Sequence, residues 1–456
     1  MLSTTASAQS VDRGTEGGTA RAMTLSEALA YAHSHHPRIA ESESEIAVAR
    51  AETRVPRARW LPQIGATLQA IVGTNNSSST NWLGTGGVVE FPRVSGTAVL
   101  QQPSDINWQP YMNTAAGLTL TQRVWDFGRT AAEEAAADAV VDVARSRAID
   151  ERLRVELAVR EAYYAVLAAR GVVTAADDAV RRASAHRDFA HAWVDQGMRP
   201  RIELERAEAD LSRFEVGSIR ARGGLEVAQA VFAASVGFEA QRLDASGDGG
   251  DIEGTPTLAN AIRDGETRDP ALAAANARLR AQQAQTRVLD ADMLPEIRLV
   301  ASVLSSAGGA PGGPRNDPAF GEGFVPWIPN YFAGLVFSWR LYDGVTRARR
   351  DVSRQIEDTL RARIAAVRQE ATTAIQQQWI GVQVARRALP ALERALTAAE
   401  ANYAQAEARF RSGLGTSVEL ADAEALRTDA QIQVALGRFE VARARAQFAR
   451  AVAEGP

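Results

Sequence analysis

The 456-residue sequence contains no cysteine and no lysine, and each absence narrows the range of possible functions. Without cysteine the chain has no disulfides, no thiolate metal site, no cysteine nucleophile and no lipidated N-terminal cysteine. All 51 basic residues are arginine, and the 55 acidic residues bring the net charge to −4. Because a nucleic-acid surface needs a concentrated positive field, this balance argues against nucleic-acid binding.

Long hydrophobic runs are also missing. No apolar run reaches the roughly 18 residues of a transmembrane helix. At the start of the chain, Ala6-Ser7-Ala8 resembles a signal-peptidase site, but the charged and hydrophobic regions that should precede it are absent. Residues 1–23 are therefore either the remnant of a signal region whose true start lies upstream or an ordinary disordered tail.

What is present is an internal duplication. Leu61-Pro62-Gln63-Ile64 recurs 233 positions later as Leu294-Pro295-Glu296-Ile297, and Gly128 and Gly197 recur 216 positions later as Gly344 and Gly413. A fixed offset over a long stretch indicates two copies of one structural unit. We predict a first repeat at 24–238, an inter-repeat linker at 239–257 and a second repeat at 258–456.

Each repeat contains two segments in which apolar and polar residues alternate. Ile64 and Leu68 fall on one face of the first segment, and Gln63 and Thr67 fall on the other. Alternation over nine or ten residues is typical of membrane β-strands, which we predict at 63–72, 118–125, 296–304 and 335–342. Aromatic residues at the strand ends suit the belts of a membrane interface; they are Trp125, Trp327, Tyr331 and Tyr342.

Two helices too long for an ordinary globular domain follow the strands. Alanine, glutamate, arginine and leucine dominate 129–195 and 346–411, and these residues favour helix. About 67 residues at 1.5 Å each give a rod of about 100 Å, which must pack along its length to be stable. We predict turns at Gly197 and Gly413, with return helices at 201–237 and 418–453.

Four strands are too few to close a membrane barrel, whose smallest closed forms use about eight. An open sheet edge cannot face lipid, so several copies of the chain must pool their strands. Strands that are polar on one face, together with a ring of long helices, would enclose a water-filled conduit.

In its motifs and their order, the chain resembles the TolC-like outer-membrane efflux protein family over residues 24–453. The residues that carry the resemblance are Leu25-Ser26-Glu27-Ala28-Leu29 with His36-Pro37, Leu61-Pro62, Trp125-Asp126-Phe127-Gly128-Arg129, Tyr342-Asp343-Gly344, Arg409-Phe410-Arg411-Ser412-Gly413 and Val418-Glu419-Leu420-Ala421-Asp422-Ala423. The resemblance implies a mainly α fold with membrane β-strands, which trimerises into a 12-stranded β-barrel joined to an α-helical barrel. It also implies an exit duct in the outer membrane that extends into the periplasm. Its partners would be outer-membrane lipid, a periplasmic adaptor (membrane fusion protein) and an inner-membrane RND or ABC transporter.

The resemblance further assigns functions to individual residues. It places gate acids at Glu203, Glu419 and Asp422. The family often has an arginine in the second tip turn, where this chain has Gly415, so Arg199 or Arg201 is expected to replace it in the latch. Adaptor contacts are expected at the tip turns (Gly197, Arg199, Arg201, Arg409, Gly413 and Gly415), and strand–helix junctions at Asp126, Gly128, Asp343 and Gly344.

Other interpretations of the same residues stay open. The three acids could instead stabilise helix N-termini through the helix dipole. A soluble periplasmic coiled-coil scaffold, with 63–72 and 118–125 as a small sheet, is the alternative class of protein. His33, His35 and His36 fit a solvated helix end better than a metal site. No catalytic constellation is present, and we expect neither an enzyme nor a cofactor. Drug efflux, metal efflux and type I protein secretion are not separated by these residues.

Overall fold

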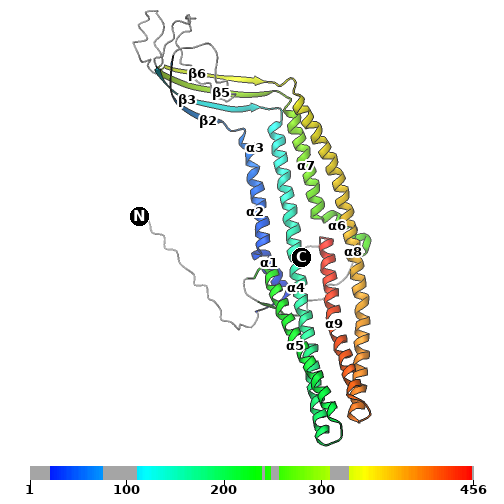
Figure 1. The fold of residues 1–456 in the computed structure, drawn as a ribbon. Helices are drawn as coiled ribbons and strands as arrows, with labels where there is room; N and C mark the ends of the chain where they lie inside the picture. The colour runs from blue at the N-terminus through cyan, green and yellow to red at the C-terminus, as the bar shows by residue number, and fades with distance from the viewer. Residues whose placement is uncertain (1–20, 75–109, 239–241, 248–255, 309–327, 454–456) are drawn as a thin grey trace, which may run out of the picture. The chain divides into compact units, whose positions relative to one another are not determined.

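The computed structural model describes residues 21–74, 110–238, 242–247, 256–308 and 328–453 (Figure 1). The signal-like segment at 6–8, the expected interface residue Trp327 and most of the expected linker lie outside the described residues. The chain divides into two units, with unit 1 formed by 1–48, 141–277 and 360–456, and unit 2 by 49–140 and 278–359. Among the described residues, no helix combines the length and the apolar character needed to cross a membrane.

Unit 1 is built from helices and one very small sheet. Its complete elements are β1 (Arg21–Met23), α1 (Leu25–His35), α5 (Arg201–Val236), β4 (Leu243–Ala245), α6 (Leu258–Arg268) and α9 (Ser417–Ala451). The long helices α4 (Arg129–Asp195) and α8 (Gly344–Arg411) contribute residues to both units, as do α2 (Pro37–Glu52) and α7 (Pro270–Ala291). Thr24 caps α1, because its hydroxyl accepts from Glu27 N–H while the Glu27 carboxylate accepts from Thr24 N–H.

The duplication continues through the return helices. α5 begins at 201 and α9 at 417, a difference of 216 that equals the offset between Gly128 and Gly344. Matched positions of the two long helices are fully buried: Val159 and Val166 on α4 correspond to Ile375 and Val382 on α8. The two repeats therefore use the same helical stripe to form their cores.

The small parallel sheet of β1 and β4 corrects two expectations. The expected tail includes residues 21–23 and the expected linker includes 243–245, but Arg21 pairs with Leu243 and Met23 with Ala245. Leu243 and Ala245 are buried against the core around Tyr163, whose hydroxyl donates to the Ser246 carbonyl at 2.7 Å. Three-residue strands are too short to show alternation, so only their tertiary packing identifies them.

Unit 2 contains the larger sheet. α3 (Arg54–Ala58), β2 (Gln63–Thr74), β3 (Pro110–Trp125), β5 (Glu296–Gly308) and β6 (Ile328–Ser338) lie wholly within it. The four strands are antiparallel in the order β2-β3-β5-β6, and Figure 1 shows them side by side. β2 and β6 are the edges of this sheet.

The pairing register assigns the predicted apolar and polar residues to opposite faces. Ile64 lies opposite Leu120, which lies opposite Ala301, whereas Gln63 lies opposite Thr121. The apolar face is open: Leu68 is 81% exposed and Leu335 is 68% exposed. The polar face is less uniform than expected, because Val300 and Val336 share it with Thr121 and Arg298.

The largest differences from the expected bounds are in β6 and β3. The segment predicted at 335–342 forms a strand at Ile328–Ser338, because the last pair of the β5–β6 ladder joins Glu296 to Ser338. Beyond it, the Trp339 indole donates to the Met293 carbonyl at 3.1 Å. β3 starts at Pro110 rather than 118, since its early residues pair with the end of β2. Before β2, the chain forms α2 and the short α3, with a break at Thr53.

Candidate functional site

The first tip turn joins α4 to α5 in unit 1. Gly197 takes a positive φ of 69° that glycine adopts without strain, and Met198 N–H donates to the Trp193 carbonyl at 2.9 Å. Pro200 precedes α5, where its fixed φ and missing N–H cost nothing. The turn is therefore closed by backbone bonds of its own.

The second tip turn joins α8 to α9 in the same way. Gly413 has a φ of 74°, and the N–H groups of Leu414 and Gly415 both donate to the Arg409 carbonyl at 2.9 Å. A Cβ at Gly415 would lie 3.0 Å from the Phe410 backbone nitrogen. This close approach favours glycine at position 415.

Arg199 connects the two turns. Its Nη2 donates to the carbonyl oxygens of Gly413 at 3.4 Å and of Gly415 at 3.3 Å. The guanidinium also lies 5.7 Å from the ring centre of Trp193 and 5.9 Å from that of Phe410. Arg199 thus contacts backbone oxygens and aromatic rings rather than acids. Arg201 pairs instead with Glu205 on its own helix at 3.1 Å.

The three expected gate acids have different surroundings. The Glu419 N–H donates to the Thr416 hydroxyl at 3.2 Å, and the Glu419 carboxylate lies 3.8 Å from Arg409. Glu203 lies 3.8 Å from Arg206 and is largely buried. Asp422 is exposed and makes no ion pair with any residue that the structure describes. Both Glu203 and Glu419 lie in first helical turns, as the helix-dipole interpretation also requires.

The polar atoms behind the first tip were not anticipated. Among the described residues, His186 Nε2 and Glu203 Oε2 are buried without a hydrogen-bond partner. Burial lowers the pKa of the His186 imidazole, against the opposing effect of Asp210 and Glu203. The His186 ring packs edge-on against Phe410 with 4.6 Å between centroids. No sequence motif marks this arrangement, which depends on α4, α5 and α8 meeting.

A buried ion pair joins α4 to α9 above the tips. Nε of Arg182 donates to both carboxylate oxygens of Glu424 at 2.9 Å, and Thr428 donates to the same carboxylate at 3.2 Å. Glu424 is only 4% exposed. In the sequence of α9, Glu424 stands among alanines and leucines that favour helix packing. A charged residue at such a position could have indicated a buried ion pair.

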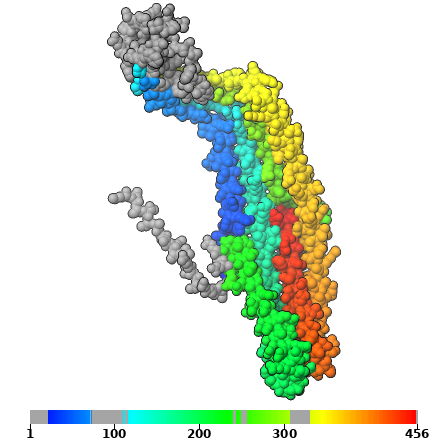
Figure 2. All heavy atoms as spheres, viewed as in Figure 1, coloured from blue at the N-terminus to red at the C-terminus, as the bar shows by residue number. Residues whose placement is uncertain are grey.

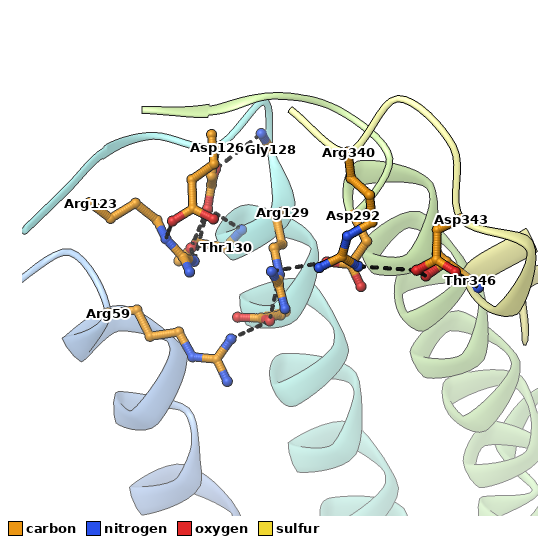
Figure 3. Close-up of polar contacts among 12 residues, drawn as sticks. Arg59, Arg123, Asp126, Gly128, Arg129, Thr130, Asp292, Arg340, Asp343 and Thr346 are labelled. Atoms are coloured by element: carbon orange, nitrogen blue, oxygen red, sulfur yellow. Dashed lines mark hydrogen bonds and ion pairs between the residues drawn. The ribbon is translucent and has the colours of Figure 1, made fainter. Parts of the chain in front are cut away.

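The strand–helix junctions lie in unit 2 and use one design twice (Figure 3). Asp126 accepts from Thr130 N–H at 2.9 Å, from the Thr130 hydroxyl and from Arg123 at 3.3 Å. In the second repeat, Asp343 accepts from Thr346 N–H at 3.3 Å, from its hydroxyl at 2.8 Å and from Arg340 at 3.3 Å. The Thr346 hydroxyl is the main reason that the pKa of Asp343 is lowered.

One residue distinguishes the two junctions. The offset between the repeats is 217 at Asp126 but 216 at Gly128, so the first junction contains one extra residue. The extra residue is accommodated at Phe127 and Gly128, whose φ values are 51° and 91°. Gly344 does not share this left-handed conformation. Arg129, next in sequence, lies 2.9 Å from Asp292 after α7 and joins the two repeats (Figure 3).

The described residues include no group of three or more His, Asp or Glu side chains that could hold a metal ion. Long paired helices with closed tip turns, joined in sequence to an antiparallel sheet with an open apolar face, define the class of outer-membrane channel proteins with helical extensions. The family model described as outer membrane efflux protein matches residues 24–237 and 261–454. The chain belongs to this family.

Solved structures support the same fold. CusC has a TM-score of 0.75 and 14% identity, with 96% of this chain and 93% of CusC covered. VceC of Vibrio cholerae has a TM-score of 0.72 and 15% identity, with 94% and 96% covered. MtrE of Neisseria gonorrhoeae, solved in an open state, has a TM-score of 0.70 and 16% identity, with 98% and 95% covered. No curated protein sequence matches the chain.

Family membership settles several expectations. The fold class, mainly helical with a small antiparallel sheet and a TolC-like arrangement, is confirmed. The chain is an efflux channel of the outer membrane that extends into the periplasm, and it is a transport protein rather than an enzyme. Proteins of this family form trimeric channels in efflux pumps. The alternative of a soluble scaffold is rejected.

Proposed function

We propose that three copies of the chain form the exit duct of a tripartite pump or type I secretion system. They would meet a periplasmic adaptor and an RND or ABC transporter of the inner membrane. The observation that carries this proposal is the four-stranded sheet, whose edges β2 and β6 have no further partner among the described residues. Because an open edge cannot face lipid, β6 of one copy would pair with β2 of the next, and three sheets would close a 12-stranded barrel.

The duplication indicates which helices meet between copies. In the chain, α4 packs on α9 so closely that a Cβ at Gly171 would lie 2.9 Å from that of Ala435. The 216-residue offset maps Gly171 to Arg387 on α8 and Ala435 to Ile219 on α5. Both mapped residues are exposed (Ile219 by 69%), and Figure 2 shows α5 in green and α8 in orange at the molecular surface. We infer that α8 of one copy packs on α5 of the next.

A cross-linking experiment tests this arrangement, and the absence of native cysteine removes background reactions. In the Ile219→Cys/Arg387→Cys variant, oxidation should link neighbouring copies and produce a ladder that ends at three chains. Ser218→Cys/Arg387→Cys is the matched control, since Ser218 is only 8% exposed and its hydroxyl donates to Asp177 of α4 at 2.6 Å. Failure of the first pair to link copies, or a ladder that continues beyond three, would contradict the proposal.

At the periplasmic end, we propose that Glu203, Glu419 and Asp422 form an acidic entrance. Asp422 supports this most directly, because it is exposed and no described residue neutralises it. Three copies of each acid near one axis would raise the local cation concentration and favour cation passage. The two turns of each copy would move together, since Arg199 joins them.

The adaptor would dock at the tip turns. Leu414 and Met198 are large apolar side chains at the surface of these turns, and each belongs to a different repeat. Exposed apolar residues at the tips are suited to a partner surface. Arg409 and Arg201 lie beside them and would add charge contacts at the rim of the interface.

A further inference from the structure

Two arginines lie directly opposite each other on the polar face of the sheet. Arg123 of β3 pairs with Arg298 of β5 in the antiparallel register. Like charges in this arrangement destabilise a sheet, so a local acid is needed to hold them. Among the residues that the structure describes, Glu296 is the one acid that contacts both: its Oε1 lies 3.5 Å from Nε of Arg123 and 3.3 Å from Nε of Arg298.

The two arginines line a cavity of about 200 Å³ at the end of the sheet nearest the helices. We call it the arginine cavity; its lining includes Arg59, Gln63, Thr121, Arg123, Glu296 and Arg298. Asp126 and Glu133, which pair with Arg123 and Arg59, do not line it. Three arginines and a single acidic residue therefore line the cavity.

Arg298 retains most of its binding capacity. Its Nε contact with Glu296 is its one polar side-chain contact among the described residues, and its side chain is 48% exposed. A guanidinium has five N–H donors in a planar fork that matches carboxylate and phosphate oxygens. Arg123, by contrast, is only 16% exposed and is fixed by Asp126, Thr130 and Glu296.

We propose that the arginine cavity binds a phosphate or carboxylate group. The anion would lie between Arg298, Arg123 and Arg59, while the Gln63 amide and the Thr121 hydroxyl supply neutral hydrogen bonds. A volume of about 200 Å³ is below the roughly 300–1,000 Å³ of drug-sized sites, so it suits one anionic group rather than a whole large molecule. That the anion belongs to a solute in transit rests on the proposed function, but the binding does not, because one chain supplies every lining residue.

Inorganic phosphate titrated into the detergent-solubilised full-length protein tests the proposal, with chloride at matched ionic strength as reference. Binding is measured by calorimetry and by the shift in thermal unfolding. Arg298→Gln should weaken phosphate binding at least tenfold. Glu296→Gln should strengthen it several-fold, because the competing carboxylate is lost, and misfolding does not produce a gain in affinity. Arg349→Gln, an exposed arginine outside the cavity, is the matched control and should bind as wild type.

The source of the anion is separated by lipid composition. In nanodiscs of phosphatidylglycerol, a lipid headgroup that reaches the cavity would compete and weaken phosphate binding relative to phosphatidylcholine. Unchanged phosphate affinity would identify a soluble solute, and either result supports the site. Absence of phosphate binding to the wild type, or equal weakening in the Arg298 and Arg349 variants, would overturn it. Neither of these depends on trimerisation, which the cysteine cross-link reports separately.

Discussion

Replacing the junction aspartates by alanine should have unequal effects, although the two occupy equivalent places in the repeats. Asp126 is 3% exposed and caps the start of α4 through Gly128 N–H and Thr130 N–H. Loss of such a cap costs about 1 kcal/mol. The Thr130 hydroxyl is fully buried and would lose its acceptor, which adds about 1–3 kcal/mol. We expect Asp126→Ala to lower the free energy of unfolding by about 3 kcal/mol, by adding the two contributions.

Asp343 makes the same set of contacts at a more accessible site, so water can replace the lost carboxylate. Asp343→Ala should therefore destabilise the protein distinctly less than Asp126→Ala. The assay is denaturant unfolding of each solubilised variant, followed by the helical circular dichroism signal. The midpoint and the slope of the transition together give the free energy of unfolding. Equal losses for the two variants, or a larger loss for Asp343→Ala, would refute the argument from burial.

Three further predictions concern the sheet, the entrance and acid. Arginine at Leu120 should impair membrane assembly by about 2–4 kcal/mol, whereas arginine at Thr121 on the polar face should be tolerated; equal assembly yields would reject the assigned faces. Asp422→Ala should reduce cation selectivity in single-channel recordings. If replacing Glu203, Glu419 and Asp422 together by alanine leaves the selectivity unchanged, these acids do not form a selective entrance and only stabilise helix starts. The pKa of Asp343 is lowered in the folded state. The stability that its carboxylate adds to the fold is therefore complete above the pKa of the unfolded state, and it is lost as the pH falls through the pKa of the folded state. Asp343→Asn should flatten this acid dependence of the unfolding midpoint, and an unaltered profile would contradict it.

The long helices were predictable because their information is local and repeated. Alanine-rich sequence with apolar positions at helical spacing identifies α4 and α8, and the offset of 216 supplies a second copy of each signal. The turns at Gly197 and Gly413 follow from residues that tolerate positive φ. Such features need no knowledge of what packs against them.

The sheet and its strand ends were only partly predictable. Alternation continues through Leu341, but β6 stops at Ser338 because its partner strand begins at Glu296. The sequence assigns Arg123 and Arg298 to polar faces, yet only the register brings them opposite each other. A strand end is set by its partner, which a single-strand pattern does not contain.

The tip showed the same limit. The glycine at 415 raised the expectation that Arg199 or Arg201 would take over a pairing with acid. Arg199 instead donates to carbonyl oxygens of the second turn and lies near two aromatic rings, while Arg201 pairs within its helix. Phe410 lies more than 200 positions from Arg199, so no sequence spacing could predict this contact.

The central claim is that copies of the chain pool their strands and helices into one conduit. The mass of the complex extracted from the outer membrane in detergent tests it most directly, by light scattering corrected for bound detergent. Three chains of 48.9 kDa per particle is the predicted result. A particle that contains one chain, or a protein released into solution without detergent, would contradict the account.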